Sequence, residues 1–185
     1  MTAPEFTPWP KIARLNRDIV ITEKIDGTNA AVVVTDDLEV FAQSRTRIIT
    51  PGDDNFGFAS WVSIHAADLA KLLGPGVHFG EWWGSGIQRG YGLPRGERRF
   101  SLFNTNRWTD ADLSAIEALE VVPVLYEGPF SQAAVTHALV ALAYQGSFAG
   151  NGFKRPEGVV VYHKAARTMF KVTLENDDAP KGQTT

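Results

Sequence analysis

A lysine followed closely by Asp-Gly stands where it can act as a nucleophile. Lys24 lies between two apolar runs, 19–21 and 30–34, and Asp26-Gly27 follows it after one residue. An amine that is buried or flanked by another cation loses its proton more easily, and the neutral amine is nucleophilic. Residues 22–29 are also typical of a solvated hairpin turn, because Asp-Gly is a common turn dipeptide. Taken alone, the octapeptide favours the turn.

Other ionisable residues stand inside or beside short apolar strands. Glu157 precedes the apolar run 158–161, where a carboxylate is costly unless it is paired or bound to a metal. Lys171 lies between Phe170 and Val172, and strand alternation turns it away from the core face that we expect these two residues to occupy. Cations and carboxylates that converge on one groove suit a phosphate-bearing ligand and a divalent metal. The predicted groove residues are Lys24, Arg45, Glu81, Glu157 and Lys171.

The elements that must position these residues form a strand-rich α+β pattern. Alternation and turn residues predict strands at 19–22, 30–35, 39–44, 77–83, 99–104, 121–126, 158–163 and 168–174. Helical spacing and capping residues predict about three helices, at 58–73, 109–119 and 131–144. No βαβ alternation recurs, and neither a GxGxxG nor a GxxxxGK[ST] fingerprint occurs, which excludes the Rossmann and P-loop classes.

Length and composition predict one domain over residues 1–185, with an irregular proline-rich N-terminal segment at 1–18 and a flexible polar tail at 176–185. The absence of cysteine excludes disulfides and thiolate-bound zinc. No apolar run approaches the roughly 20 residues that span a bilayer, and no signal peptide is evident, so we expect a cytoplasmic protein without a membrane partner. A net charge of −3 argues against binding nucleic acid through bulk charge alone.

Three features each allow two interpretations. The glycine-rich segment 84–96 fits either a mobile lid or a plain connection. Trp82-Trp83 fits a surface that stacks on bases, although adjacent tryptophans more often place one ring in the core and one on the surface. Several arginines fit either a local basic surface or scattered solubilising charges; they are Arg89, Arg95, Arg98, Arg99 and Arg107.

Six short motifs, in the correct order over about residues 20–175, resemble those of the covalent nucleotidyltransferases, the ATP-dependent ligases and capping enzymes. The matching segments are Lys24-Ile25-Asp26-Gly27 (motif I, KxDG), Ser44-Arg45, Phe79-Gly80-Glu81 (motif III), Phe100–Asn104 (motif IIIa), Glu157-Gly158-Val159-Val160 (motif IV) and Phe170-Lys171-Val172 (motif V). The string from Glu23 to Asn29 is most similar to the RNA ligase 2 type of phage and RNA-editing ligases. The resemblance implies an antiparallel-sheet-rich, ATP-grasp-like ligase core without an OB domain.

The resemblance also implies a mechanism and its catalytic residues. Lys24 would attack the α-phosphorus of ATP to form a lysyl-AMP intermediate, and AMP would then pass to a nucleic acid 5′-phosphate for strand sealing. Lys171 would grip the α-phosphate and assist Lys24. Glu157 would hold Mg²⁺ (or Mn²⁺).

By the same resemblance, five residues would bind the nucleotide. Glu81 would hold the ribose hydroxyls, Phe103 would stack on the adenine, and Glu23 would sense the adenine. Arg45 and Asn29 would contact the AMP phosphate or the incoming 5′-phosphate. The expected partner is nucleic acid, with RNA ends or nicks preferred.

Two departures from the pattern leave alternatives open. Motif V usually carries two lysines, but here only Lys171 is present between Met169 and Thr173, and Lys164 or Arg167 would have to replace the second. The chain also ends soon after motif V, so we expect either a core that adenylylates itself but seals poorly, or a partner protein that supplies a C-terminal module. The alternatives are a capping-type or DNA-ligase-type nucleotidyltransferase, or a catalytically weak nucleic-acid-binding protein on the same scaffold.

Overall fold

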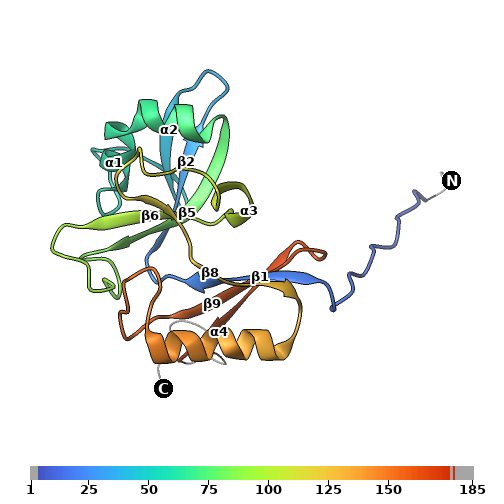
Figure 1. Ribbon diagram of the computed structural model, residues 1–185. Helices are drawn as coiled ribbons and strands as arrows, with labels where there is room; N and C mark the ends of the chain where they lie inside the picture. The colour runs from blue at the N-terminus through green and yellow to red at the C-terminus, as the bar shows by residue number, and fades with distance from the viewer. Residues whose placement is uncertain (1–3, 176, 178–185) are drawn as a thin grey trace.

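Two β-sheets dominate the computed structural model, which describes residues 4–175 and 177 (Figure 1). The four-stranded sheet has the order β10-β9-β1-β8, and the six-stranded sheet has the order β4-β3-β2-β5-β6-β7. All neighbours are antiparallel except β6 and β7. The strands of the first sheet are β1 (Asp18–Lys24), β8 (Val124–Pro129), β9 (Gly158–His163) and β10 (Thr168–Thr173). Those of the second are β2 (Thr28–Val34), β3 (Val40–Ser44), β4 (Ile48–Ile49), β5 (Gly76–Gly84), β6 (Arg98–Leu102) and β7 (Leu119–Val121).

Each sheet carries helices on one face. α1 (Phe58–Ile64) and α2 (Ala66–Leu73) pack on the six-stranded sheet, and α4 (Gln132–Gln145) lies along the four-stranded sheet (Figure 1). The Ser131 side chain caps α4 by accepting a hydrogen bond from Ala134 N, as the sequence predicts. A one-turn helix, α3 (Thr105–Trp108), follows β6. The α+β prediction is therefore confirmed, with four helices in the part of the chain that the structure describes.

Two of the predicted helices differ from the observed ones. The helix expected at 58–73 is two helices, because the backbone at His65 leaves the helical region between α1 and α2. The helix expected at 109–119 is absent. Asn104 caps α3 earlier by accepting from Arg107 N, and Asp112 then accepts from Ser114 N, a local bond that competes with a helix.

The strand predictions hold at the level of existence and differ at some boundaries. The strand expected at 121–126 is divided between β7 and β8, which belong to different sheets, and the division falls at Val122-Pro123. The short β4 was not predicted. Residues 4–17 form no helix or strand, in line with their prolines, and they extend away from the sheets (Figure 1). Of the tail expected at 176–185, all except residue 177 lies outside the described residues.

Alternation along the strands divides each sheet into a face beneath the helices and an opposite face, which in β5 carries both Glu81 and the buried Trp83. Val32, Trp82 and Phe100 enter the core beneath α1 and α2, while Ile21 and Val159 enter the core beneath α4. The neighbours of these residues, such as Glu81 beside Trp82, therefore point to the opposite face. The chain passes from β1 to β2 through residues 25–27, so the two faces opposite the helices meet at Lys24.

Gly158, the first residue of β9, has a backbone that other residues rarely adopt. Its φ is +155°, and a Cβ atom there would lie 2.2 Å from the carbonyl oxygen of Val172 in β10. We expect Gly158→Ala to lower the free energy of unfolding by on the order of 3 kcal/mol, measured by urea denaturation. Gly52→Ala is the matched control, because nothing lies within 4 Å of its Cβ position; it should change stability by less than about 0.5 kcal/mol. Equal effects would contradict the close approach.

Candidate active site

A cavity of about 330 Å³ lies at the connection between the end of β1 and the start of β2. It brings together five of the predicted site residues, Lys24, Asn29, Arg45, Glu81 and Lys171. The other lining residues are Asp26, Gly27, Thr28 and Gln88. Three cations thus reach one small polar space from three strands or strand ends. Such a space suits an anionic ligand.

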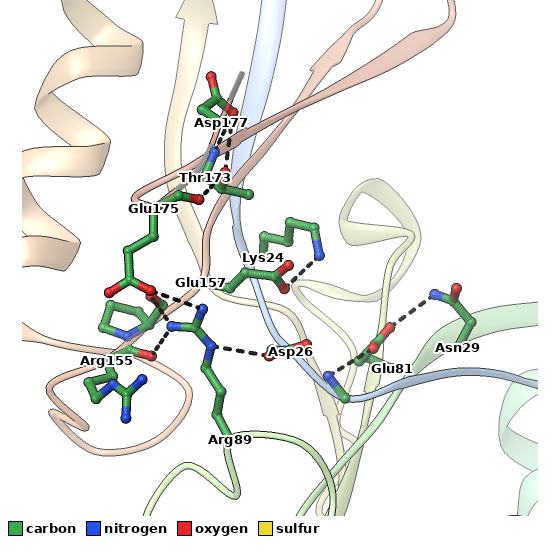
Figure 2. A network of polar contacts seen from close by, with 12 residues as sticks. Lys24, Asp26, Asn29, Glu81, Arg89, Arg155, Glu157, Thr173, Glu175 and Asp177 are labelled. Atoms are coloured by element: carbon green, nitrogen blue, oxygen red, sulfur yellow. Dashed lines mark hydrogen bonds and ion pairs between the residues drawn. The ribbon is translucent and has the colours of Figure 1, made fainter. Parts of the chain in front are cut away.

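Lys24 forms an ion pair with Glu157 beside this cavity (Figure 2). The Lys24 Nζ lies 2.6 Å from Glu157 Oε2, and the side chains are 21% and 4% exposed. The pairing of β1 with β9 places Lys24 opposite Gly158, which brings the preceding residue, Glu157, next to the amine. The sequence expectation that Glu157 needs a cationic partner is confirmed.

Glu81 is buried in β5 and binds the start of β2. Its Oε1 accepts a hydrogen bond from Gly27 N and its Oε2 accepts one from Asn29 Nδ2, each at 3.0 Å (Figure 2). Burial raises the pKa of Glu81 to about 7, although the charge of Lys24 opposes the shift. The approach requires glycine at 27, because a Cβ there would lie 2.5 Å from the carbonyl oxygen of Trp82.

Lys171 reaches the cavity from the edge strand β10. It pairs with Val160, which pairs with Thr22, so it shares a sheet face with Lys24, as alternation predicts. Its neighbour Phe170 was expected in the core, and this is wrong: Phe170 is 56% exposed. The reason is that β10 lies at the edge of the sheet, whereas α4 packs on β8 and β9.

Besides Glu157, two predicted site residues lie outside the cavity lining, Glu23 and Phe103. Glu23 is buried, and its Oε2 accepts hydrogen bonds from Phe148 N and Ala149 N. Its Oε1 is also buried and has no such partner within the described part of the chain. Burial raises the pKa of this carboxyl. Phe103 follows β6 and is 41% exposed, two residues beyond Ser101, the cross-strand partner of Glu81.

The glycine-rich segment supplies site residues that the sequence analysis did not identify. Tyr91 is buried, and its hydroxyl accepts a hydrogen bond from Asp26 N at 2.8 Å. Arg89 Nε donates to Asp26 Oδ2 at 3.1 Å (Figure 2). With Ile87 also fully buried, the segment is anchored in the core and is not a detached lid. The signal in the sequence was the pair of large apolar residues, Ile87 and Tyr91, among the glycines.

The structure shows where both tryptophans lie and which contacts two of the five arginines make. Trp82 and Trp83 are both buried, on opposite faces of β5, so neither ring is at the surface. Arg98 donates to the carbonyl oxygens of Phe56 and Ser85, and Arg99 pairs with Glu97 and Glu120. Lys164, a suggested replacement for the second lysine of motif V, pairs with Glu127 instead.

The carboxylates here fit a metal that arrives with a ligand better than a resident one. No group of three or more His, Asp or Glu side chains that could hold a metal occurs among the described residues. Glu157 is a buried carboxylate beside the cavity, and Mg²⁺ is commonly held by one or two carboxylates together with substrate phosphates. The site therefore fits a cation carried by a nucleotide.

A sequence profile of the RNA ligase family matches residues 17–173, which includes every residue of this site. The chain belongs to the RNA ligase family. No curated protein sequence matches it. The recognised motifs thus identify the family, while the phage or RNA-editing subtype stays a prediction.

Solved RNA ligase structures share the fold. A Naegleria gruberi RNA ligase mutant with AMP and Mn has a TM-score of 0.65 and 18% identity, covering 86% of this chain and 50% of its own. A second mutant of that ligase, with ATP and Mn, has a TM-score of 0.62 and 19% identity, covering 85% and 50%. This chain therefore spans about half the length of these ligases.

The helices among the described residues are too short or too polar to span a membrane.

The raised pKa of Glu81 predicts a pH-dependent stability. The pKa of Glu81 is about 7 in the folded protein and 4.5 in the unfolded chain. The protonated carboxyl therefore contributes its full stability below pH 4.5, and this contribution is lost as the pH rises through 7. From about pH 5 to about pH 8, the free energy of unfolding of the wild type should therefore fall by about 2 kcal/mol relative to Glu81→Gln. Urea denaturation of both proteins across this range measures the difference. Parallel pH profiles would contradict it.

Proposed function

We propose that this RNA ligase family member is an ATP-dependent adenylyltransferase that forms a lysyl-AMP intermediate at Lys24. The observation that carries the proposal is the Lys24 amine, 2.6 Å from the buried carboxylate of Glu157, at a cavity that Arg45 and Lys171 also line. A nucleophilic amine, a carboxylate for a metal and two cations for phosphates are the groups that attack on a nucleoside triphosphate needs.

The first step forms one bond and breaks one bond at phosphorus. The neutral Lys24 Nζ attacks the α-phosphorus of ATP, an N–P bond forms, and pyrophosphate leaves with the electrons of the broken P–O bond. Mg²⁺ or Mn²⁺ bound with ATP supplies positive charge that neutralises the phosphates, and Glu157 is the residue that would hold it. The Lys24 amine would be free to attack once its ion pair with Glu157 breaks, and its proton would pass to water.

Each residue around the cavity contacts a different part of the nucleotide. Lys171 grips the α-phosphate, and Glu81 accepts hydrogen bonds from the ribose hydroxyls. Phe103 offers a partly exposed ring for the adenine. The buried Oε1 of Glu23, for which the described residues provide no hydrogen-bond partner, would accept from the adenine amino group. The Naegleria gruberi ligases with AMP or ATP and Mn support a nucleotide with a divalent metal on this fold.

The later steps transfer AMP to a nucleic acid. An oxygen of a 5′-phosphate attacks the lysyl-AMP phosphorus, the N–P bond breaks, and Lys24 is regenerated. A 3′-hydroxyl then attacks the 5′-phosphate, forms the phosphodiester and expels AMP. Arg45 is exposed at the cavity edge, so it and Asn29 are placed to contact the 5′-phosphate. RNA ends or nicks are the proposed substrate, with a further module or partner protein engaging the strand.

A nucleic-acid-binding protein without turnover is the second candidate, because the second lysine of motif V is absent. Thr173 occupies that position, and its hydroxyl donates to the carbonyl oxygen of Glu175 at 2.9 Å. It pairs with Gly158, directly across from Lys24, so a neutral side chain stands where a second cation would. This candidate predicts that no covalent adduct forms.

Incubation with ATP and Mg²⁺ or Mn²⁺, followed by intact mass measurement, tests the proposal. We expect the wild type to gain the mass of one AMP and Lys24→Ala to gain none, because the nucleophile is removed. Lys71→Ala, which removes an exposed lysine of α2, is the control and should react like the wild type. Replacing ATP with GTP distinguishes a capping-type enzyme, which would form its adduct with GTP. Absence of any adduct from folded, nucleotide-free wild type would favour the binding protein.

A further inference from the structure

We propose that Arg89 is a positioning residue that holds Glu157 in register with Lys24 by binding motif I and the peptide before motif IV at the same time. The proposal rests on the adenylyltransferase function argued above and adds a residue outside the recognised motifs. Arg89 lies in the glycine-rich segment after β5, and its side chain points from that loop toward Asp26, Arg155 and Glu175 (Figure 2).

One guanidinium makes four contacts on three separate parts of the chain. Its Nε donates to Asp26 Oδ2 at 3.1 Å, two residues after Lys24. Its Nη1 donates to the carbonyl oxygens of Arg155 at 2.9 Å and Pro156 at 3.2 Å, the two residues before Glu157. Its Nη2 lies 3.7 Å from Glu175 Oε2, beyond β10.

Glu157 needs such an anchor because it stands just outside the sheet. The β9 ladder begins at Gly158, opposite Lys24, so the ladder positions the lysine but not the residue that pairs with it. On the C-terminal side, Leu174 N donates to the Glu157 carbonyl oxygen at 2.9 Å. On the N-terminal side, Arg89 holds the two preceding carbonyls. The peptide that carries the carboxylate is therefore fixed from both ends.

A lysine at 89 could not make these contacts together. The guanidinium is planar, presents five N–H donors in a fixed fork and stays charged, whereas an ammonium is a point charge on a flexible stem. Arg89 is only 23% exposed and Asp26 only 15%, so water screens their attraction less than at the open surface.

The Arg89 contacts also differ from the Lys24–Glu157 pair in their relation to the reaction. Forming the lysyl-AMP bond consumes the Lys24 ammonium and ends that ion pair. The bonds from Arg89 involve no reacting atom, so they can keep Glu157 in place while its partner is modified. A small displacement of a group near the reacting phosphorus costs up to about 100-fold in rate.

The test compares Arg89→Ala and Arg89→Lys with the wild type. We expect both to lower the maximal rate of lysyl-AMP formation, Arg89→Ala by about 100-fold, while the KM for ATP changes less than about threefold. Free guanidinium, at concentrations far below those that unfold proteins and against a KCl control, should restore part of the Arg89→Ala rate. Hydrogen exchange of nucleotide-free Arg89→Ala should speed up at residues 155–158.

Arg98→Ala is the matched control, because Arg98 also holds two loop carbonyls, those of Phe56 and Ser85, away from the cavity. It should keep the wild-type rate, and guanidinium should not alter it. An equal loss in Arg98→Ala, a loss confined to KM, unchanged exchange at 155–158 or no guanidinium rescue would overturn the proposal. Absence of an adduct in the wild type would instead refute the proposed function, and the exchange measurement on nucleotide-free protein would still decide whether Arg89 holds this peptide.

Discussion

The burial of the Glu157 carboxylate is the constraint on which the rest of the site depends. A carboxylate that is 4% exposed is costly unless a cation and hydrogen bonds compensate it, and Lys24 supplies the cation at 2.6 Å. The antiparallel register of β1 and β9 places Gly158 opposite Lys24, which brings the preceding residue, Glu157, near the amine. The close approach of β10 to Gly158 then limits which backbone can begin β9. The ion pair of Lys24 with Glu157 and the junction of β9 with β10 therefore depend on the same backbone at Gly158.

Three buried glutamates around Lys24 are compensated in three different ways. Glu157 has the ammonium, Glu81 has Gly27 N and the Asn29 amide, and Glu23 has two backbone N–H groups after α4. Burial raises the pKa of Glu81 and the pKa of Glu23, although both carboxylates accept hydrogen bonds. Lys24 therefore need not balance all three carboxylates, and the charges of Arg45 and Lys171 are left to face a ligand.

The sequence predicted the site better than the elements between its parts. Alternation correctly turned Lys171 away from the core face and onto the sheet face that carries Lys24, because the period of a strand is set by its backbone. It could not show that β10 lies at an edge, which leaves Phe170 exposed, since strand order depends on distant pairings. The contacts of Arg89 and Tyr91 with Asp26 were missed because a glycine-rich segment has no period. Asp112 shows the same limit, since a single side-chain bond replaced an expected helix.

The cations that line the cavity come from two sheets, so their spacing depends on the connections between the sheets. Lys171 comes from the four-stranded sheet and Arg45 from the six-stranded sheet, and no strand is shared by both. With Thr173 in place of a second lysine, no further cation from β10 can compensate if the sheets shift. The contacts that cross between the sheets therefore set the spacing of these cations. Asp26 bound by Arg89 and Tyr91, and Glu81 bound to Gly27, fix the crossing at the residues that follow Lys24.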